Sequence, residues 1–262
     1  MTDNPEEHKM PLLDHLVELR RRLLYSLAGF VVIFIGCFFV ADYLFNFLVG
    51  PLAEVWSDQE GRRLIYTALH EKFFTNVKVA FFTAAFLAFP LIAVQVWTFV
   101  APGLYRNEKR AFVPFLVATP ILFFAGGAFV FYMVLPVAWT FFASFEQLAT
   151  EGPLAIQLEP KVNEYLSLTM RLIFAFGISF ELPVAITLLA RAGLATAEGL
   201  ARKRRYAVVL AFVAGALLTP PDPISQLSLA APIVLLYELS IWAAKLVERA
   251  RLRTTEAAEA GE

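Results

Sequence analysis

The chain has 262 residues, of which 59% are hydrophobic and only 17% charged, and it carries 26 phenylalanines and a net charge of −1. This composition excludes an ordinary soluble domain, because several uncharged runs are each long enough to cross a bilayer of about 30 Å. The single cysteine, Cys37, excludes an internal disulfide framework. We therefore expect an all-α polytopic membrane protein, surrounded by lipid and without a nucleic-acid partner.

Six transmembrane helices are predicted, and they form one membrane domain covering residues 1–262. The predicted spans are residues 23–41, 73–100, 111–138, 165–190, 206–218 and 224–244. Prolines interrupt four of them, so kinked and curved helices are expected. The last two spans are short, since the run from Tyr206 to Pro220 makes only about 21 Å of helix. Outward loops are expected at roughly 42–72 and 139–164, and a disordered tail at 245–262.

The distribution of basic residues predicts the orientation of these spans. Sixteen of the 22 lysines and arginines lie in the amino-terminal segment, in the second and fourth connections, and in the tail. The opposite loops hold only four. Because cytoplasmic loops carry the excess of positive charge, both termini are predicted to be cytoplasmic.

Residues 1–22 contain a pattern typical of an amphipathic cytoplasmic helix lying along the membrane surface. Four leucines at helical spacing form one apolar stripe, and acidic and basic residues lie four apart on another face. The leucines are Leu12, Leu16, Leu19 and Leu23, and the charged residues are Asp14, Glu18 and Arg22. Glu18 is therefore either available to a ligand or simply paired with Arg22, an interaction worth only a few tenths of a kcal/mol.

A second acid, Glu108, lies in the predicted cytoplasmic turn at residues 102–110 and is the only acid there. Two carboxylates on one face would suit a ligand with two guanidinium groups, because the planar fork of arginine binds a carboxylate bidentately. The alternative is a solvated loop glutamate.

A third acid, Glu181, lies within the run from Leu172 to Ala190, which holds no other charge. A carboxylate at that depth normally faces a protein interior or a water-filled cavity. Two alternatives are open: Ser179 or Thr187 satisfies the acid within its own bundle, or the acid serves a proton- or ion-coupled small-molecule transporter. The transporter hypothesis is disfavoured because such proteins often have broken segments in both halves, whereas here both short spans are carboxy-terminal.

Four motifs in chain order resemble the TatC family, the six-helix receptor subunit of the twin-arginine protein translocase. They are His15-Leu16-x-Glu18-Leu19-Arg20; Gln95-Val96-Trp97 continuing through Phe99, Ala101-Pro102 and Leu104-Tyr105 to Glu108; Phe176-Gly177-x-Ser179-Phe180-Glu181-x-Pro183; and Leu218-Thr219-Pro220-Pro221-Asp222 followed by Ser225-Gln226. The resemblance covers essentially the whole chain. One departure is Phe131, beside Tyr132, where the family has an aromatic hydroxyl, so the role of this pair stays undefined.

The resemblance implies that Glu18 and Glu108 receive the paired arginines of a signal peptide, supported by Arg20 and an apolar surface at Phe99 and Leu104. It also implies export of folded proteins with the partners TatB and TatA, driven by the proton motive force. Glu181 would project into the concave side of the bundle. It further implies that Pro51, in an outward loop, contacts other TatC copies. Thr219 and Gln226 would form a polar patch that contacts TatB and TatA.

No catalytic residue, metal site or cofactor is expected. The sequence has no glycine-rich phosphate loop for ATP. Its three histidines, His8, His15 and His70, lie outside the predicted spans, which disfavours haem or zinc within the membrane. Ser179 beside Glu181 lacks a nearby histidine or lysine base, so an enzyme is not predicted.

Overall fold

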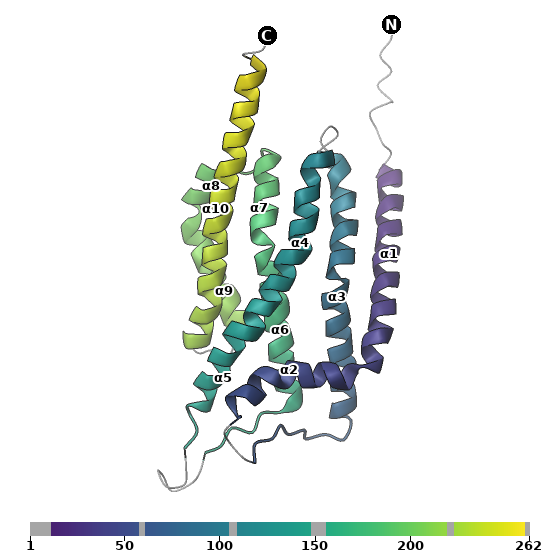
Figure 1. Cartoon of the computed structure of the whole chain (residues 1–262), viewed down its shortest axis with the longest axis vertical. Helices are drawn as coiled ribbons and strands as arrows, with labels where there is room; N and C mark the ends of the chain where they lie inside the picture. The colour runs from purple at the N-terminus through teal and green to yellow at the C-terminus, as the bar shows by residue number, and fades with distance from the viewer. Residues whose placement is uncertain (1–11, 58–60, 105–108, 148–155, 219–222, 260–262) are drawn as a thin grey trace. The chain divides into compact units, whose positions relative to one another are not determined.

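The computed structural model describes residues 12–57, 61–104, 109–147, 156–218 and 223–259. Within these ranges every regular element is a helix (Figure 1), and β-type pairing is limited to the isolated bridges Ile65 to Lys161 and Gln147 to Ile156. The all-helical prediction is confirmed.

Five helical segments are long and apolar enough to cross a membrane, and each overlaps a predicted span. They are His15–Phe39, Glu71–Phe99, Pro114–Ala143, Val162–Arg191 and Gln226–Arg249. The predicted span 206–218 corresponds to α9 (Arg204–Leu218), whose 15 residues make about 22 Å of helix. That is shorter than the hydrocarbon core of about 30 Å, so the sixth crossing stays a prediction.

The chain forms two compact units, which are described separately. Unit 1 comprises residues 1–44 and 77–120, and unit 2 comprises residues 45–76 and 121–262. Three helices contribute to both units: α2 (Ala41–Val55), α3 (Glu71–Leu104) and α4 (Lys109–Phe129).

Unit 1 is built on the packing of α1 (Leu12–Phe39) against α3. Cys37 and Ala41 pack with Ala80 and Ala84 in one buried cluster, because small side chains let membrane helices approach closely. The predicted surface helix before the first span is wrong, because residues 12–22 are the first turns of α1 itself. They contain no glycine or proline to interrupt it.

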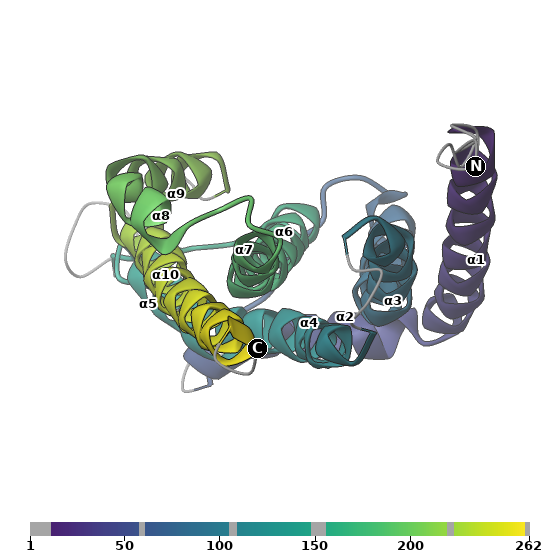
Figure 2. The same cartoon turned by 90° about the horizontal axis from the view of Figure 1, so that it is seen from above.

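Unit 2 contains the remaining helices. They are the π-helical turn η2 (Val130–Val134), α5 (Leu135–Ala143), α6 (Val162–Phe180), α7 (Leu182–Arg191), α8 (Ala197–Arg202), α9 and α10 (Pro223–Glu259). The helix α10 packs along α7 and α9 (Figure 2). α4 and α6 approach closely, since a Cβ placed on Gly126 would lie 2.6 Å from the Phe176 carbonyl oxygen.

Proline explains the break between α6 and α7, whereas α2 and α4 each continue through a proline. α6 ends before Glu181 and α7 begins after it, because Pro183 has no N–H to continue the hydrogen-bond ladder. By contrast, α3 continues through Pro90 and α10 through Pro232. α7 itself ends at Arg191, followed by Gly193 in a left-handed conformation (φ 75°) that suits a helix terminus.

Two predictions about irregular segments are wrong. The outward loop expected from residue 42 contains α2, whose Leu48 and Leu52 are buried, and the Tyr165 hydroxyl donates to the Leu48 carbonyl at 3.0 Å. The tail expected to be disordered from Lys245 continues α10 as helix to Glu259. That segment is rich in alanine, glutamate and arginine, which are strong helix formers.

Candidate functional site

The first turns of α1 lie against the end of α3 in unit 1. The His15 imidazole stacks on the Phe99 ring, with centroids 4.3 Å apart and planes at 23°. Glu18 follows one turn later on α1. The structure therefore brings two of the predicted site residues, Glu18 and Phe99, to the same end of unit 1, and it leaves Arg20 exposed on α1.

The other two predicted members of this surface fall largely outside the described residues. Leu104 is the last residue of α3, but its side chain is not described, and Glu108 lies in the undescribed segment 105–108 just before α4 begins. Their juxtaposition with Glu18 therefore stays a prediction.

The end of α3 is fixed against α4 by a hydrogen bond within unit 1. The Trp97 indole Nε1 donates to the Thr119 hydroxyl at 3.1 Å, and Thr119 is buried. Because a buried polar pair is costly to separate, this bond restricts how far the two helices can part at this level.

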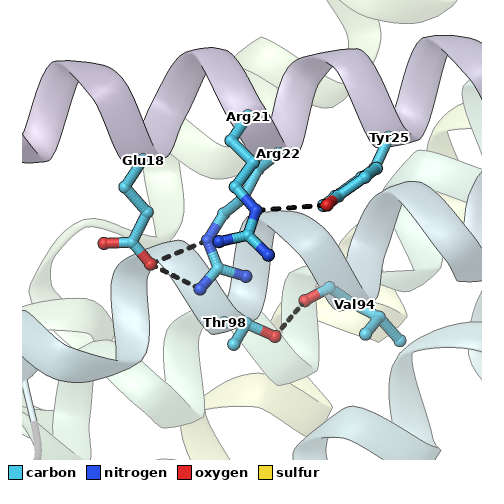
Figure 3. A network of polar contacts seen from close by, with 6 residues as sticks. All are labelled: Glu18, Arg21, Arg22, Tyr25, Val94 and Thr98. Atoms are coloured by element: carbon cyan, nitrogen blue, oxygen red, sulfur yellow. Dashed lines mark hydrogen bonds and ion pairs between the residues drawn. The ribbon is translucent and has the colours of Figure 1, made fainter.

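Glu18 is engaged by an arginine of its own helix. Arg22 donates from Nε to Glu18 Oε1 at 2.9 Å and from Nη2 to the same oxygen at 2.5 Å (Figure 3). Arg21 instead donates from Nε to the Tyr25 hydroxyl at 3.2 Å, with its guanidinium 5.5 Å from the ring centroid. Of these two arginines, only Arg22 is paired with the carboxylate.

An apolar pocket of about 540 Å³ lies beside this pair, between α1 and α3. Its polar lining is limited to Arg22, Ser26 and Gln95. The apolar lining residues are Leu19, Leu23, Leu27, Phe30, Ile92, Val96 and Phe99. A mainly apolar concavity with a few polar groups at one side is typical of a ligand site. Among the described residues no cluster of three His, Cys, Asp or Glu side chains is placed to hold a metal ion.

Glu181 occupies the junction between α6 and α7 in unit 2. It is half-buried, and its backbone N–H bonds to the Ile178 carbonyl at 3.0 Å. Ser179 donates to the Ala175 carbonyl at 2.7 Å and Thr187 to the Pro183 carbonyl at 2.5 Å. Both hydroxyls thus bond to the backbone of their own helices.

The predicted partner-contact residues occupy different environments. Pro51 was expected in an outward loop, but it lies inside α2 and is buried, because α2 occupies that segment. Gln226, on α10, donates from Nε2 to the Phe212 carbonyl of α9 at 3.1 Å. Thr219 lies outside the described residues.

Sequence analysis missed a second arginine–glutamate pair, in unit 2. Both guanidinium Nη atoms of Arg62 donate to the two carboxylate oxygens of Glu146, and the Leu158 N–H donates to Glu146 Oε1 at 2.8 Å. Arg62 also lies over the Trp56 ring at 5.3 Å. We call the group of Trp56, Arg62, Glu146 and Leu158 the loop clasp. The pair joins residues 84 apart, and no local spacing in the sequence signals it.

The loop clasp perturbs the acid at its centre. The Arg62 guanidinium, helped by the Leu158 N–H, holds the pKa of the Glu146 carboxyl below its usual range, against the opposing effect of burial. Glu146 is therefore maintained as a carboxylate.

Phe131 and Tyr132, whose role the sequence leaves undefined, lie in the π-helical turn η2. Phe131 is buried and stacks on Phe47 of α2, with centroids 4.6 Å apart and planes at 4°, whereas Tyr132 is exposed. At Phe131, where the family has an aromatic hydroxyl, this chain therefore has a side chain that contacts Phe47 of α2 by ring stacking.

Comparison with known proteins gives consistent results. A family profile described as "Sec-independent protein translocase protein (TatC)" matches residues 14–232. The TatC protein of Magnetococcus marinus is 48% identical over 97% of this chain and 91% of its own length, and that of Escherichia coli K12 is 41% identical over 90% and 88%. A crystal structure described as "Twin Arginine Translocase Receptor- TatC" superposes with a TM-score of 0.77 at 37% identity, covering 89% of this chain and 99% of that one.

Proposed function

The chain belongs to the TatC family of Sec-independent protein translocase proteins, and on that premise we propose that it is the receptor that binds twin-arginine signal peptides. It is a multi-pass membrane subunit of twin-arginine translocation and not an enzyme. In this proposal it works with TatB, TatA and further TatC copies to export folded proteins, with the proton motive force as energy source.

One observation carries the proposal: the His15–Phe99 stack holds the turn of Glu18 against the end of α3, beside an apolar pocket. A carboxylate next to an apolar concavity suits a ligand that is cationic at one point and apolar at the next. Glu108, in the connection that follows α3, would supply a second carboxylate for a second guanidinium.

The proposed topology places this surface in the cytoplasm, with six crossings of the inner membrane. It includes α9 as a short crossing, which a bilayer accommodates by local thinning or by a partner helix. Reporter fusions after Lys109, Arg204 and Glu262 should be cytoplasmic, and fusions near Asp58 and Glu151 should be outward. A fusion after Lys109 that reports on the outward side would contradict a cytoplasmic Glu108.

The test is binding of a fluorescent peptide, with two consecutive arginines followed by an apolar segment, to the detergent-solubilised chain. Charged hydrogen bonds contribute roughly 1.5 to 3 kcal/mol each, so Glu18→Ala or Glu108→Ala should weaken binding about ten- to a hundredfold. Replacing the arginines of the peptide with lysines should also weaken it, because lysine cannot form the bidentate pair.

The matched control is Glu198→Ala. Glu198 also pairs with an arginine four residues later, Arg202, at 2.5 Å, but it lies on α8 in unit 2. This variant should bind the peptide like the parent. If the double variant Glu18→Ala with Glu108→Ala also binds like the parent, these carboxylates are not the receptor.

Contacts with the partner subunits are proposed at Glu181, at Thr219 with Gln226, and at the helix that holds Pro51. Glu181 would meet a polar group of a partner helix or of the inserting signal, because acidic residues within membrane spans commonly mark functional contacts. Glu181→Gln should keep much of the export activity, whereas Glu181→Ala should impair export without weakening peptide binding. Full export by Glu181→Ala would remove Glu181 from the proposal.

A further inference from the structure

Glu18 in this structure already holds a guanidinium. Arg22 directs Nε and Nη2 to one carboxylate oxygen, Oε1, and the two residues lie four apart on α1 with the acid on the amino-terminal side. That order is the favourable one for a helical ion pair. Figure 3 shows Arg21, the adjacent arginine, directed to Tyr25.

Arg22 is held in this position by its surroundings as well as by the charge. Its side chain is only 21% exposed and lines the apolar pocket with Leu19 and Phe99, whereas Glu18 is 39% exposed. An arginine stem commonly buries its methylene groups against apolar surface while its charged end stays polar. The carboxylate thus remains accessible from outside while one of its oxygens is occupied from inside.

We infer that Arg22 is an internal competitor, a guanidinium of the chain itself that occupies Glu18 until an arginine of the signal peptide replaces it. The inference rests on the proposed function, since it assumes that Glu18 receives the signal. The exchange substitutes one guanidinium for another, so the carboxylate loses no hydrogen bonds.

The competition is weak and has a defined thermodynamic signature. A helical pair of this spacing lowers the affinity of Glu18 for a competing ligand by about twofold. Because Arg22 competes only in the free protein, its removal should tighten every ligand of Glu18 by the same factor. A twin-arginine peptide and its twin-lysine counterpart should therefore gain equally, and the ratio of their affinities should not change.

The adjacent arginine provides a matched control. Arg21→Gln and Arg22→Gln remove the same positive charge one residue apart, so both reduce repulsion of a cationic peptide to a similar extent. Only Arg22→Gln frees Glu18. Arg22→Lys, which keeps the charge and most of the stem, provides a second variant in which packing against the pocket is preserved.

The experiment measures the Kd of the fluorescent twin-arginine and twin-lysine peptides for the full-length, detergent-solubilised chain at low salt, where the pair is least screened. Relative to Arg21→Gln, Arg22→Gln should lower both Kd values by about twofold, with Arg22→Lys between that variant and the parent. In a Glu18→Gln background the difference between Arg21→Gln and Arg22→Gln should vanish.

Equal Kd values for Arg21→Gln and Arg22→Gln would overturn the inference. So would weaker binding by Arg22→Gln, which would make Arg22 a supporting residue for the peptide. A gain that persists in the Glu18→Gln background would also overturn it, because the effect would not pass through Glu18. Failure of the proposed function gives a different result, namely an unchanged Kd for Glu18→Gln with Arg22 intact.

Discussion

Two of the arginine–glutamate pairs in this chain, one in each unit, have opposite characters. Glu18 and Arg22, in unit 1, are neighbours on one helix and share a single carboxylate oxygen, with side chains 39% and 21% exposed. Glu146 and Arg62, in unit 2, join segments 84 residues apart through both carboxylate oxygens and are 16% and 13% exposed. A local, half-exposed pair can exchange partners at little cost, whereas a bidentate, largely buried pair between distant segments cannot.

One glycine in each unit shows a similar contrast. In unit 2 a Cβ on Gly126 would meet a backbone oxygen, that of Phe176, at 2.6 Å. In unit 1 a Cβ on Gly29 would meet the Leu91 side-chain tip at 2.8 Å. A side-chain tip can move to another rotamer and a packed backbone cannot, so this part of unit 1 is better suited to adjust around a ligand.

Breaking the loop clasp should have the largest effect on stability. Arg62→Gln leaves the Glu146 carboxylate largely buried without its guanidinium, and we expect a loss of about 2 kcal/mol in the free energy of unfolding, measured by thermal or denaturant unfolding in detergent. Arg63→Gln is the control, because Arg63 is 69% exposed in its pair with Glu159 and such surface pairs contribute little. Equal losses in the two variants would contradict a structural role specific to the clasp.

The loop clasp should also make the free energy of unfolding depend on pH. The folded-state pKa of Glu146 lies below its unfolded value, so its contribution is fully present above the unfolded pKa and is lost as pH falls through the folded pKa. The stability advantage of the parent over Glu146→Gln should therefore be constant from pH 7 to about pH 5 and should shrink below about pH 4.5. A difference that does not change with pH down to about pH 3 would contradict this.

The contrast between the pairs also explains what the sequence could predict. The five long spans are visible because uncharged runs of their length have few other interpretations, and the Glu18–Arg22 contact follows from four-residue spacing on a helix. Arg62 and Glu146 carry no such signal, because nothing in either segment specifies a partner 84 residues away. The helix α2 was missed for a similar reason: Leu48 and Leu52 are buried by unit 2, and a short apolar segment alone does not distinguish a loop from a packed helix.

Removing the local pair should have the smallest effect on stability. Arg22→Gln breaks a helical ion pair whose carboxylate stays accessible to water, so the free energy of unfolding should change by no more than about 0.5 kcal/mol. Arg202→Gln, which breaks the exposed pair with Glu198 on α8, is a reference for a pair with no proposed ligand and should give a similarly small change. Both are compared with Arg62→Gln in the same unfolding assay. If Arg22→Gln costs as much as Arg62→Gln, then Arg22 is a structural support of unit 1. In that case an arginine of the signal peptide could not displace Arg22 from Glu18 without a large loss of stability.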